Sequence, residues 1–171
     1  MLLESEEARA VNMSRKVLCK TLANEDCEVI TITSRDQNEV PHEQRKGVVI
    51  SARVHPGETV SSWMMRGVLF FLTDPTSDEA KMLRDNFVFK IVPMLNPDGV
   101  INGNYRTSLA GCDLNRRYKT PSKILHPTIY ALKKLCKKIQ EERSLLMYCD
   151  LHGHSRKQNV FMYGCDRREN P

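Results

Sequence analysis

The chain has 171 residues, of which 40% are hydrophobic and 27% charged, a composition typical of one globular domain and not of a disordered segment. Its net charge of +5 is mildly basic, and because no run of five or six like charges occurs, we expect no nucleic-acid partner. Six scattered cysteines fit neither a disulfide framework nor a zinc ribbon, and the lack of a signal peptide or a long apolar run predicts a soluble intracellular protein with no membrane partner.

Four elements are expected in the first third of the chain. Residues 5–23 are rich in Glu, Ala, Arg, Lys and Leu, and they predict an amphipathic helix. Residues 28–33 alternate apolar and polar side chains, which predicts a strand, and the polar residues 36–47 predict a loop. Residues 47–54 form a nearly continuous apolar run, as expected of a strand that is buried on both faces.

The middle of the chain predicts two helices and a third strand. Residues 59–73 carry apolar residues at helical spacing and predict a buried helix, residues 77–84 predict a short helix, and residues 86–93 predict a strand. The large side chains of the first helix that we expect in the core are Trp63, Met64, Met65, Val68, Phe71 and Leu72.

The last third of the chain begins with an irregular segment, residues 96–121, and loops of this length are usually functional. Residues 122–143 predict a basic helix whose residues 133–138 face solvent, and residues 145–151 and 159–163 predict two further strands. Strands separated by helices predict an α/β fold with a mixed, largely parallel sheet flanked by helices.

Three polar clusters lie at or just beyond the ends of these strands, at residues 55–58, 96–117 and 152–154. In open α/β sheets, ligands bind beyond the carboxyl ends of the strands. We therefore expect the three clusters to belong to one site.

The first cluster, His55-Pro56-Gly57-Glu58, places a histidine and a carboxylate three residues apart at a strand-to-helix turn. Catalytic zinc is commonly held by two histidines and one glutamate, so His55 and Glu58 are candidate ligands. The alternative is an ordinary surface histidine and a glutamate whose charge suits the first turn of a helix.

The second cluster, residues 150–155, follows the apolar run Leu-Leu-Met-Tyr-Cys with an aspartate and two histidines. Strand alternation would place His152 and His154 on the same face, so periodicity does not choose between them as a ligand. The alternative for either is a hydrogen-bonded core histidine.

The third cluster, residues 111–118, holds Asn115 and Arg116, with Arg106 upstream. The planar guanidinium of arginine pairs bidentately with a carboxylate, and asparagine adds a neutral donor. Beside a zinc ion, this set could hold the terminal carboxylate of a peptide and polarise its last amide. Without the other clusters, a solvated loop would be the simpler interpretation.

Four motifs in order resemble the zinc metallocarboxypeptidases of the carboxypeptidase A type: His-Pro-Gly-Glu at 55–58, Leu-Asn-Pro-Asp-Gly at 95–99, Asp-Leu-Asn-Arg at 113–116 and Asp-Leu-His-Gly-His-Ser at 150–155. The most similar branch is the cytosolic carboxypeptidases, which remove glutamates from side chains and C-termini of tubulin. The resemblance implies one Zn²⁺ per chain, held by His55, Glu58 and His152, with Asp113 orienting the ring of His55.

The resemblance also implies how a substrate is held. Asn115 and Arg116 would anchor its carboxylate, and Arg106 would bind it and stabilise the oxyanion. It implies glutamate-rich protein tails such as those of tubulin as partners, and a cytosolic location associated with microtubules or cilia.

The family's general-base glutamate lies several dozen residues after the second histidine ligand, whereas here only residues up to Pro171 follow and Glu169 comes too early. We therefore expect residues 1–171 to form a single partial catalytic domain, truncated at its C-terminus and without the base. A second hypothesis is a catalytically incomplete fragment or isoform that binds zinc and C-terminal tails. In a third, no metal binds, and His55 and His152 are ordinary polar residues.

Overall fold

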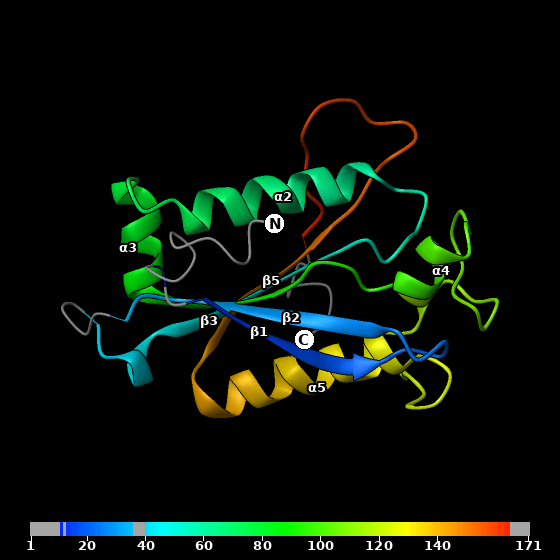
Figure 1. Ribbon diagram of the computed structural model, residues 1–171, viewed down its shortest axis with the longest axis horizontal. Coiled ribbons are helices and arrows are strands. Elements are labelled where there is room, and N and C mark those ends of the chain that lie inside the picture. The colour runs from blue at the N-terminus through cyan, green and yellow to red at the C-terminus, as the bar shows by residue number, and fades with distance from the viewer. Residues whose placement is uncertain (1–10, 12, 36–39, 165–171) are drawn as a thin grey trace.

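The computed structural model describes residues 11, 13–35 and 40–164, which form one five-stranded sheet with helices on both faces (Figure 1). The strands are β1 (Met13–Lys20), β2 (Asp26–Ile32), β3 (Lys46–Ala52), β4 (Phe87–Val92) and β5 (Leu145–Leu151). The α-helices are α2 (Val60–Thr73), α3 (Asp78–Asn86), α4 (Pro97–Ile101) and α5 (Pro127–Glu142), and the short 3₁₀ helices are η1 (His42–Gln44) and η2 (Leu114–Arg116). Among these helices, none is long and apolar enough to cross a membrane.

The strand order is β1-β2-β4-β3-β5. β3 pairs in parallel with β4 and β5, while β2 is antiparallel to both β4 and β1. Four of the strands therefore run in one direction, which confirms the expected mixed, largely parallel sheet. The carboxyl ends of β3, β4 and β5 lie at the same end of the sheet, and the segments that follow these strands carry the three polar clusters.

Two apolar layers hold the helices to the sheet. Met65 and Leu72 of α2 pack on one face, and Ile129, Leu132 and Ile139 of α5 pack on the other. Figure 1 shows these two helices on opposite sides of the strands. Alternate residues of β3 enter the two layers, which is why its sequence is apolar almost throughout.

The helix expected at residues 5–23 is wrong where the structure describes it, because residues 13–20 form strand β1. Residues 11 and 21–23 are not helical either, and the rest of that prediction, residues 5–10 and 12, lies outside the described residues. β1 pairs with β2, and Arg15 forms an ion pair with Glu28 across the two strands. Pairing with a neighbouring strand overrides the helix propensity of Arg, Lys and Leu.

The strand expected at residues 159–163 is also wrong. These residues form no strand, Asn159 has φ 61°, and Val160 is 94% exposed. A strand needs a partner ladder, and among the described residues β5 pairs only with β3. The segment instead packs on its own loop, with the Phe161 ring 5.2 Å from that of His154.

Helix α2 was expected to be buried through its largest side chains, and this holds only in part. Met65 and Leu72 are buried, but Trp63 is 65% and Phe71 45% exposed. Both faces of α2 carry apolar residues at helical spacing, so periodicity alone did not identify the face that meets the sheet. On the outer face, Arg66 stacks over the Trp63 ring at 5.5 Å from its centroid.

Candidate metal centre

The turn that follows β3 carries two of the candidate ligands, at residues 55–58. The N–H of Gly57 donates to the Tyr105 carbonyl at 2.7 Å, and a Cβ on this glycine would lie 2.5 Å from the Tyr105 ring. A larger residue would therefore push the turn away from its neighbour.

Two side chains hold the carbonyl groups of this turn. Nε of Arg53 donates to the Pro56 carbonyl at 2.8 Å, and its Nη1 donates to the Ser62 hydroxyl on α2 at 2.6 Å. The amide of Asn96 donates to the Val54 carbonyl at 3.2 Å. The backbone that carries the ligands is thereby fixed from both the helix and the loop after β4.

The motif at residues 95–99 supports the same turn. Oδ1 of Asn96 accepts the Gly99 N–H at 3.0 Å and so caps α4. A Cβ on Gly99 would lie 2.5 Å from the Pro56 ring, so the glycine allows α4 to approach the turn closely.

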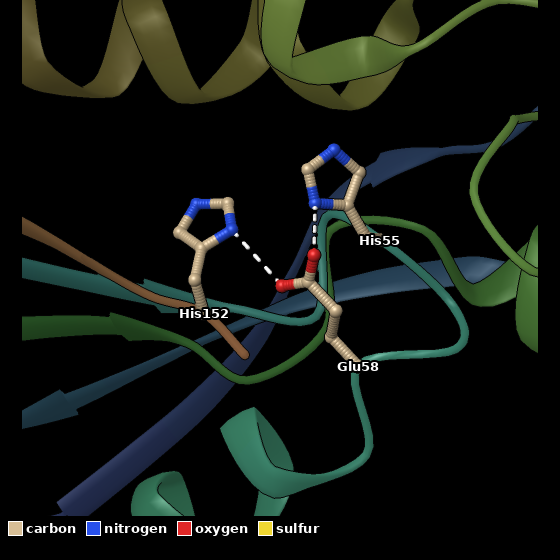
Figure 2. Close-up of side chains that lie close together, drawn as sticks. All are labelled: His55, Glu58 and His152. Carbon is tan, nitrogen blue, oxygen red and sulfur yellow. Dashed lines mark hydrogen bonds and ion pairs between the residues drawn. The ribbon is translucent and has the colours of Figure 1, made fainter. Parts of the chain in front are cut away.

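His55, Glu58 and His152 converge from the loops after β3 and β5 (Figure 2). Nδ1 of His55 lies 2.9 Å from Oε1 of Glu58, and Nδ1 of His152 lies 3.2 Å from Oε2 of the same carboxylate. One ligand atom from each of the three residues lies within 4.8 Å of the others. Two imidazoles and a carboxylate at these separations could close on one ion.

Asp113 holds the far side of the His55 ring. Its Oδ1 lies 2.9 Å from Nε2 of His55 and also accepts the N–H of Asn115, while its Oδ2 pairs with the Arg106 guanidinium at 2.8 Å. Burial pushes the pKa of Asp113 upward, but the contacts with His55, Asn115 and Arg106 outweigh it and leave that pKa below its ordinary value. Asp113 is therefore a stable acceptor for the ring proton.

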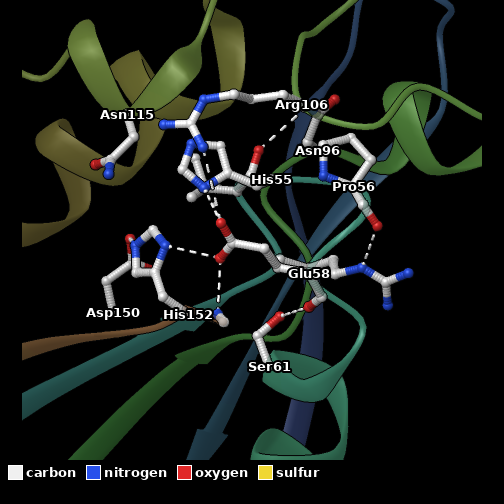
Figure 3. Close-up of polar contacts among 12 residues, drawn as sticks. His55, Pro56, Glu58, Ser61, Asn96, Arg106, Asn115, Asp150 and His152 are labelled. Atoms are coloured by element: carbon white, nitrogen blue, oxygen red, sulfur yellow. Dashed lines mark hydrogen bonds and ion pairs between the residues drawn. The ribbon is translucent and has the colours of Figure 1, made fainter. Parts of the chain in front are cut away.

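Asp150 holds His152 in the same way. Its Oδ2 lies 2.7 Å from Nε2 of His152, and this hydrogen bond is the main reason that the pKa of His152 is raised. The N–H of Gly153 donates to Oε2 of Glu58 at 2.7 Å, which ties the two ligand-bearing loops together. Figure 3 shows Asp150 behind His152, on the side away from Glu58.

These contacts test whether a metal fits. A carboxylate can only accept, so Nε2 of each histidine carries its proton toward Asp113 or Asp150, and each Nδ1 turns a lone pair toward Glu58. Nδ1 of His55 is buried, and despite its closeness to Glu58 it has no hydrogen-bond partner of acceptable geometry. Acceptors that face one another in this way need a cation or a proton between them, and the donor set suits zinc.

Arg106 reaches the cluster, with Nη1 3.9 Å from Oε1 of Glu58 and 44% of its side chain exposed. Asn115 is drawn with this group in Figure 3, on the side of Arg106 and His152. Arg116 follows in η2 and is exposed. The structure therefore brings Arg106 and Asn115 to the ligands and places Arg116 next along the same loop.

His154, the other candidate histidine of this cluster, makes its hydrogen bonds within its own loop. Its Nδ1 accepts the N–H groups of Arg156 and Lys157, and the side chain is exposed. His152 is thus the histidine of this pair that meets Glu58.

Sequence reasoning missed the supports around the ligands. Arg53 and Asn96 hold the turn, and Asp150 holds His152. For Asp150 a signal was present, because strand alternation places residues two apart on the same face. For Arg53, no local pattern indicates the contact.

The chain matches the family model of zinc carboxypeptidases over residues 2–171. Cytosolic carboxypeptidase 2 of Xenopus tropicalis is 51% identical over 156 residues, which cover 91% of this chain and 16% of that protein. Cytosolic carboxypeptidase 3 of Mus musculus is 51% identical over 96% of this chain and 16% of its own length, and cytosolic carboxypeptidase 1 of Homo sapiens is 49% identical over 98% and 14%. The chain thus spans about one sixth of the length of the curated relatives that it matches.

Solved structures show the same fold. A metallo-carboxypeptidase from Burkholderia cenocepacia superposes with a TM-score of 0.75 at 30% identity, over 90% of this chain and 38% of that one. A metallo-carboxypeptidase from Pseudomonas aeruginosa, in complex with (2-guanidinoethylmercapto)succinic acid, gives 0.72 at 27% identity, over 87% and 37%.

Proposed function

Because this chain belongs to the zinc carboxypeptidase family, we propose that it provides the zinc and carboxylate sites of a metallocarboxypeptidase that removes glutamates from protein C-termini or side chains. The observation that carries the proposal is the convergence of His55, Glu58 and His152, whose ligand atoms lie within 4.8 Å of one another. Arg106 lies at the rim of this cluster. A metal-binding group beside a guanidinium is what carboxypeptidase chemistry requires.

Each residue has a definite task in this proposal. Zinc held by the three ligands would act as a Lewis acid toward the scissile carbonyl and its attacking water. Arg106, whose Nη1 lies 3.9 Å from Oε1 of Glu58, would donate to the carbonyl oxygen of the last amide and stabilise the negative charge that develops there. Asn115 and Arg116 would hold the terminal carboxylate of the substrate, which fixes the distance from the chain end to the bond that is cut.

The proposed glutamate preference rests on the resemblance of the four motifs, and the proposed cellular setting rests on the names of the relatives. The proteins at about 50% identity are named cytosolic carboxypeptidases, and we propose a cytosolic enzyme that acts on glutamate-rich tails, with tubulin at microtubules or cilia as the leading substrate. The Pseudomonas aeruginosa relative binds a succinic acid derivative, and acidic ligands of that kind match the guanidinium groups of Arg106 and Arg116.

A second candidate is a module that binds zinc and C-terminal tails without hydrolysis. The carboxylates of Glu58, Asp113 and Asp150 all have partners within the site, since Glu58 faces both imidazoles and the two aspartates each hold one histidine. None of these three is therefore available as a general base, and the loss of such a base typically lowers the rate by about 10²–10⁴.

One assay separates the two candidates. The zinc-loaded chain is incubated with a peptide that ends in several glutamates, and both released glutamate and bound peptide are measured. Release above the rate of the metal-free chain supports the enzyme, whereas binding without release supports the module. A control peptide with an amidated C-terminus should do neither. A zinc-loaded chain that neither binds nor cuts the free-acid peptide would refute both.

The metal assignment is tested separately. The purified chain should bind one equivalent of zinc, and His152→Ala should bind less than a tenth of that, whereas the neighbouring His154→Ala should retain it. Full zinc stoichiometry in His152→Ala would overturn the ligand set.

A further inference from the structure

Resting on the proposed zinc site, we propose that Ser51, Tyr148 and Tyr118 are positioning residues that hold the Asp150–His152 pair in its metal-binding orientation. They form a continuous chain of hydroxyl groups that ends on Asp150. None of the three touches the metal-binding atoms, so they would act only through Asp150.

The distances between neighbouring oxygen atoms define the hydroxyl chain. The Ser51 hydroxyl donates to Oδ1 of Asp150 at 2.6 Å, the Tyr148 hydroxyl lies 2.8 Å from that of Ser51, and the Tyr118 hydroxyl lies 2.9 Å from that of Tyr148. All three are hydrogen-bond distances for oxygen pairs. The other carboxylate oxygen of Asp150 accepts from Nε2 of His152 at 2.7 Å.

The direction of every bond follows from the acceptor at the end. An ionised carboxylate cannot donate, so the single proton of Ser51 goes to Asp150. The Ser51 oxygen must then accept from Tyr148, and the Tyr148 oxygen accepts from Tyr118, whose hydroxyl also reaches Asp150. All the hydroxyl dipoles therefore point the same way along the chain, an arrangement in which each bond strengthens the next.

The register between β3 and β5 brings the hydroxyl groups of Ser51 and Tyr148 next to Asp150. Ser51 on β3 is directly paired with Asp150 on β5, and Val49 is paired with Tyr148. Residues two apart on a strand share a face, so Tyr148, Asp150 and the following His152 project to the same side. Ser51 is fully buried, which leaves its hydroxyl to these two partners.

The two histidine ligands are supported differently. Asp113, behind His55, is held by a guanidinium and a backbone N–H, whereas Asp150, behind His152, is held by the hydroxyl chain. Without Ser51, the carboxylate of Asp150 would lose its fixed rotamer, and His152 would lose the hydrogen bond that keeps Nδ1 turned toward Glu58. Partners behind a metal ligand typically contribute about 10–100-fold to metal affinity.

The outer end of the hydroxyl chain, Tyr118, lies on the loop that carries the proposed carboxylate anchors Asn115 and Arg116. Tyr118 comes two residues after Arg116, and Nζ of Lys133 on α5 donates to the backbone carbonyls of Tyr118 and Lys119 at 3.1 and 2.8 Å. The chain of hydroxyls therefore joins the loop that would bind the substrate carboxylate to the histidine that would bind zinc.

The test removes one hydroxyl at a time, in Ser51→Ala, Tyr148→Phe and Tyr118→Phe. Tyr130→Phe on α5 removes a tyrosine hydroxyl that does not belong to the hydroxyl chain, and it serves as the matched control. The zinc dissociation constant is measured by competition with a chromogenic chelator, the visible spectrum of the Co²⁺-loaded protein is recorded, and the metal-free proteins are unfolded in urea.

We expect zinc affinity to fall about tenfold in Ser51→Ala and less in Tyr148→Phe and Tyr118→Phe, with an altered Co²⁺ spectrum in the first. Tyr130→Phe should match the unchanged chain. If Ser51→Ala folds poorly, Tyr148→Phe carries the test, because Tyr148 is 38% exposed and the substitution removes only an oxygen.

Two outcomes would overturn the inference. One is zinc affinity within twofold of the unchanged chain in both Ser51→Ala and Tyr148→Phe. The other is weaker binding accompanied by an equal loss of metal-free stability and an unchanged Co²⁺ spectrum, which would mean a structural role only. His152→Ala is run alongside: if it also keeps full zinc affinity, the proposed zinc site itself fails, and this result is distinct from failure of the hydroxyl chain.

Discussion

Arg53 adopts a backbone conformation that is unfavourable for a residue with a Cβ, with φ 57°, two residues before His55. A left-handed conformation costs a non-glycine residue about 1–2 kcal/mol. The guanidinium that this residue carries makes the two hydrogen bonds that hold the Pro56 carbonyl and the Ser62 hydroxyl. The backbone strain and the side-chain support are therefore separable by mutation.

We expect Arg53→Gly and Arg53→Ala to weaken zinc binding about equally, by about tenfold, because both remove the guanidinium. Metal-free Arg53→Gly should be more stable than Arg53→Ala by about 1–2 kcal/mol, because glycine relieves the strain. Chelator competition and urea unfolding give the two quantities. Asn24→Gly, which changes another left-handed residue (φ 64°) far from the ligands in the sequence, should leave zinc affinity unchanged. Unchanged affinity in Arg53→Gly would show that the guanidinium does not hold the site.

The raised pKa of His152 gives zinc binding a specific pH dependence. Asp150 and then Glu58 favour the protonated imidazole, so in the metal-free protein this group adds stability at low pH that is lost as the pH rises through its raised pKa. Zinc requires the neutral form.

Zinc affinity should therefore fall by about tenfold per pH unit for this proton once the pH drops below the pKa of His152. The decline should start above pH 6.5, the ordinary value for histidine. Titrations of zinc affinity from pH 8.5 to 5.5 measure the onset. Asp150→Asn, which removes the main cause of the shift, should move the onset to lower pH, and an onset that stays in place would contradict this assignment.

At the scale of secondary-structure elements, β5 is the edge strand that presents apolar side chains. Leu146 is 54% and Met147 45% exposed, and among the described residues β5 pairs only with β3. β1, at the opposite edge, carries charged residues such as Arg15 and Lys16, which discourage pairing with another chain.

We predict that the purified chain associates through β5. Leu146→Lys should lower the light scattering of concentrated solutions and shift size-exclusion elution toward the monomer, because a charge on an edge strand opposes strand addition. Val17→Lys on β1, at a residue that is 51% exposed, is the matched control and should have little effect. Equal scattering of Leu146→Lys and the unchanged chain would place the association elsewhere.

The elements also show what their sequences could and could not predict. β2 was predicted because its apolar and polar side chains alternate, and β3, β4 and β5 because their apolar runs are bounded by polar segments. The helix α5 was predicted as a basic helix over residues 122–143. Its start at Pro127 and not at residue 122 reflects the restriction that a proline places on the residue before it. β1 was missed because its strand form depends on β2, and residues 159–163 were overpredicted because a strand pattern needs a partner.

At the scale of the whole molecule, the site is assembled from segments separated by about a hundred residues. The largely parallel sheet could be inferred from the sequence, so it was predictable that the three polar clusters meet at the carboxyl end of its strands. The side-chain contacts were not, because Arg53, Ser51 and Tyr118 act through distances that depend on register and packing. The contact between Asp113 and His55, which are 58 positions apart, was predicted only from the family resemblance and not from periodicity.

In the proposed zinc site, this assembly would make the metal a cross-link between the ends of β3 and β5. Anything that binds only the folded state stabilises it, by about 2.7 kcal/mol at a free concentration 100 times the dissociation constant. For a chain of this size, that corresponds to a rise in melting temperature of roughly 5–10 °C. We expect removal of zinc with a chelator to lower the melting temperature by this amount, and re-addition of zinc to restore it. His152→Ala should melt at the same temperature with and without zinc, because one of the two strand ends has lost its ligand, whereas His154→Ala should keep the full shift. A zinc-independent melting temperature in the unchanged chain would mean that His55, Glu58 and His152 meet without binding a metal.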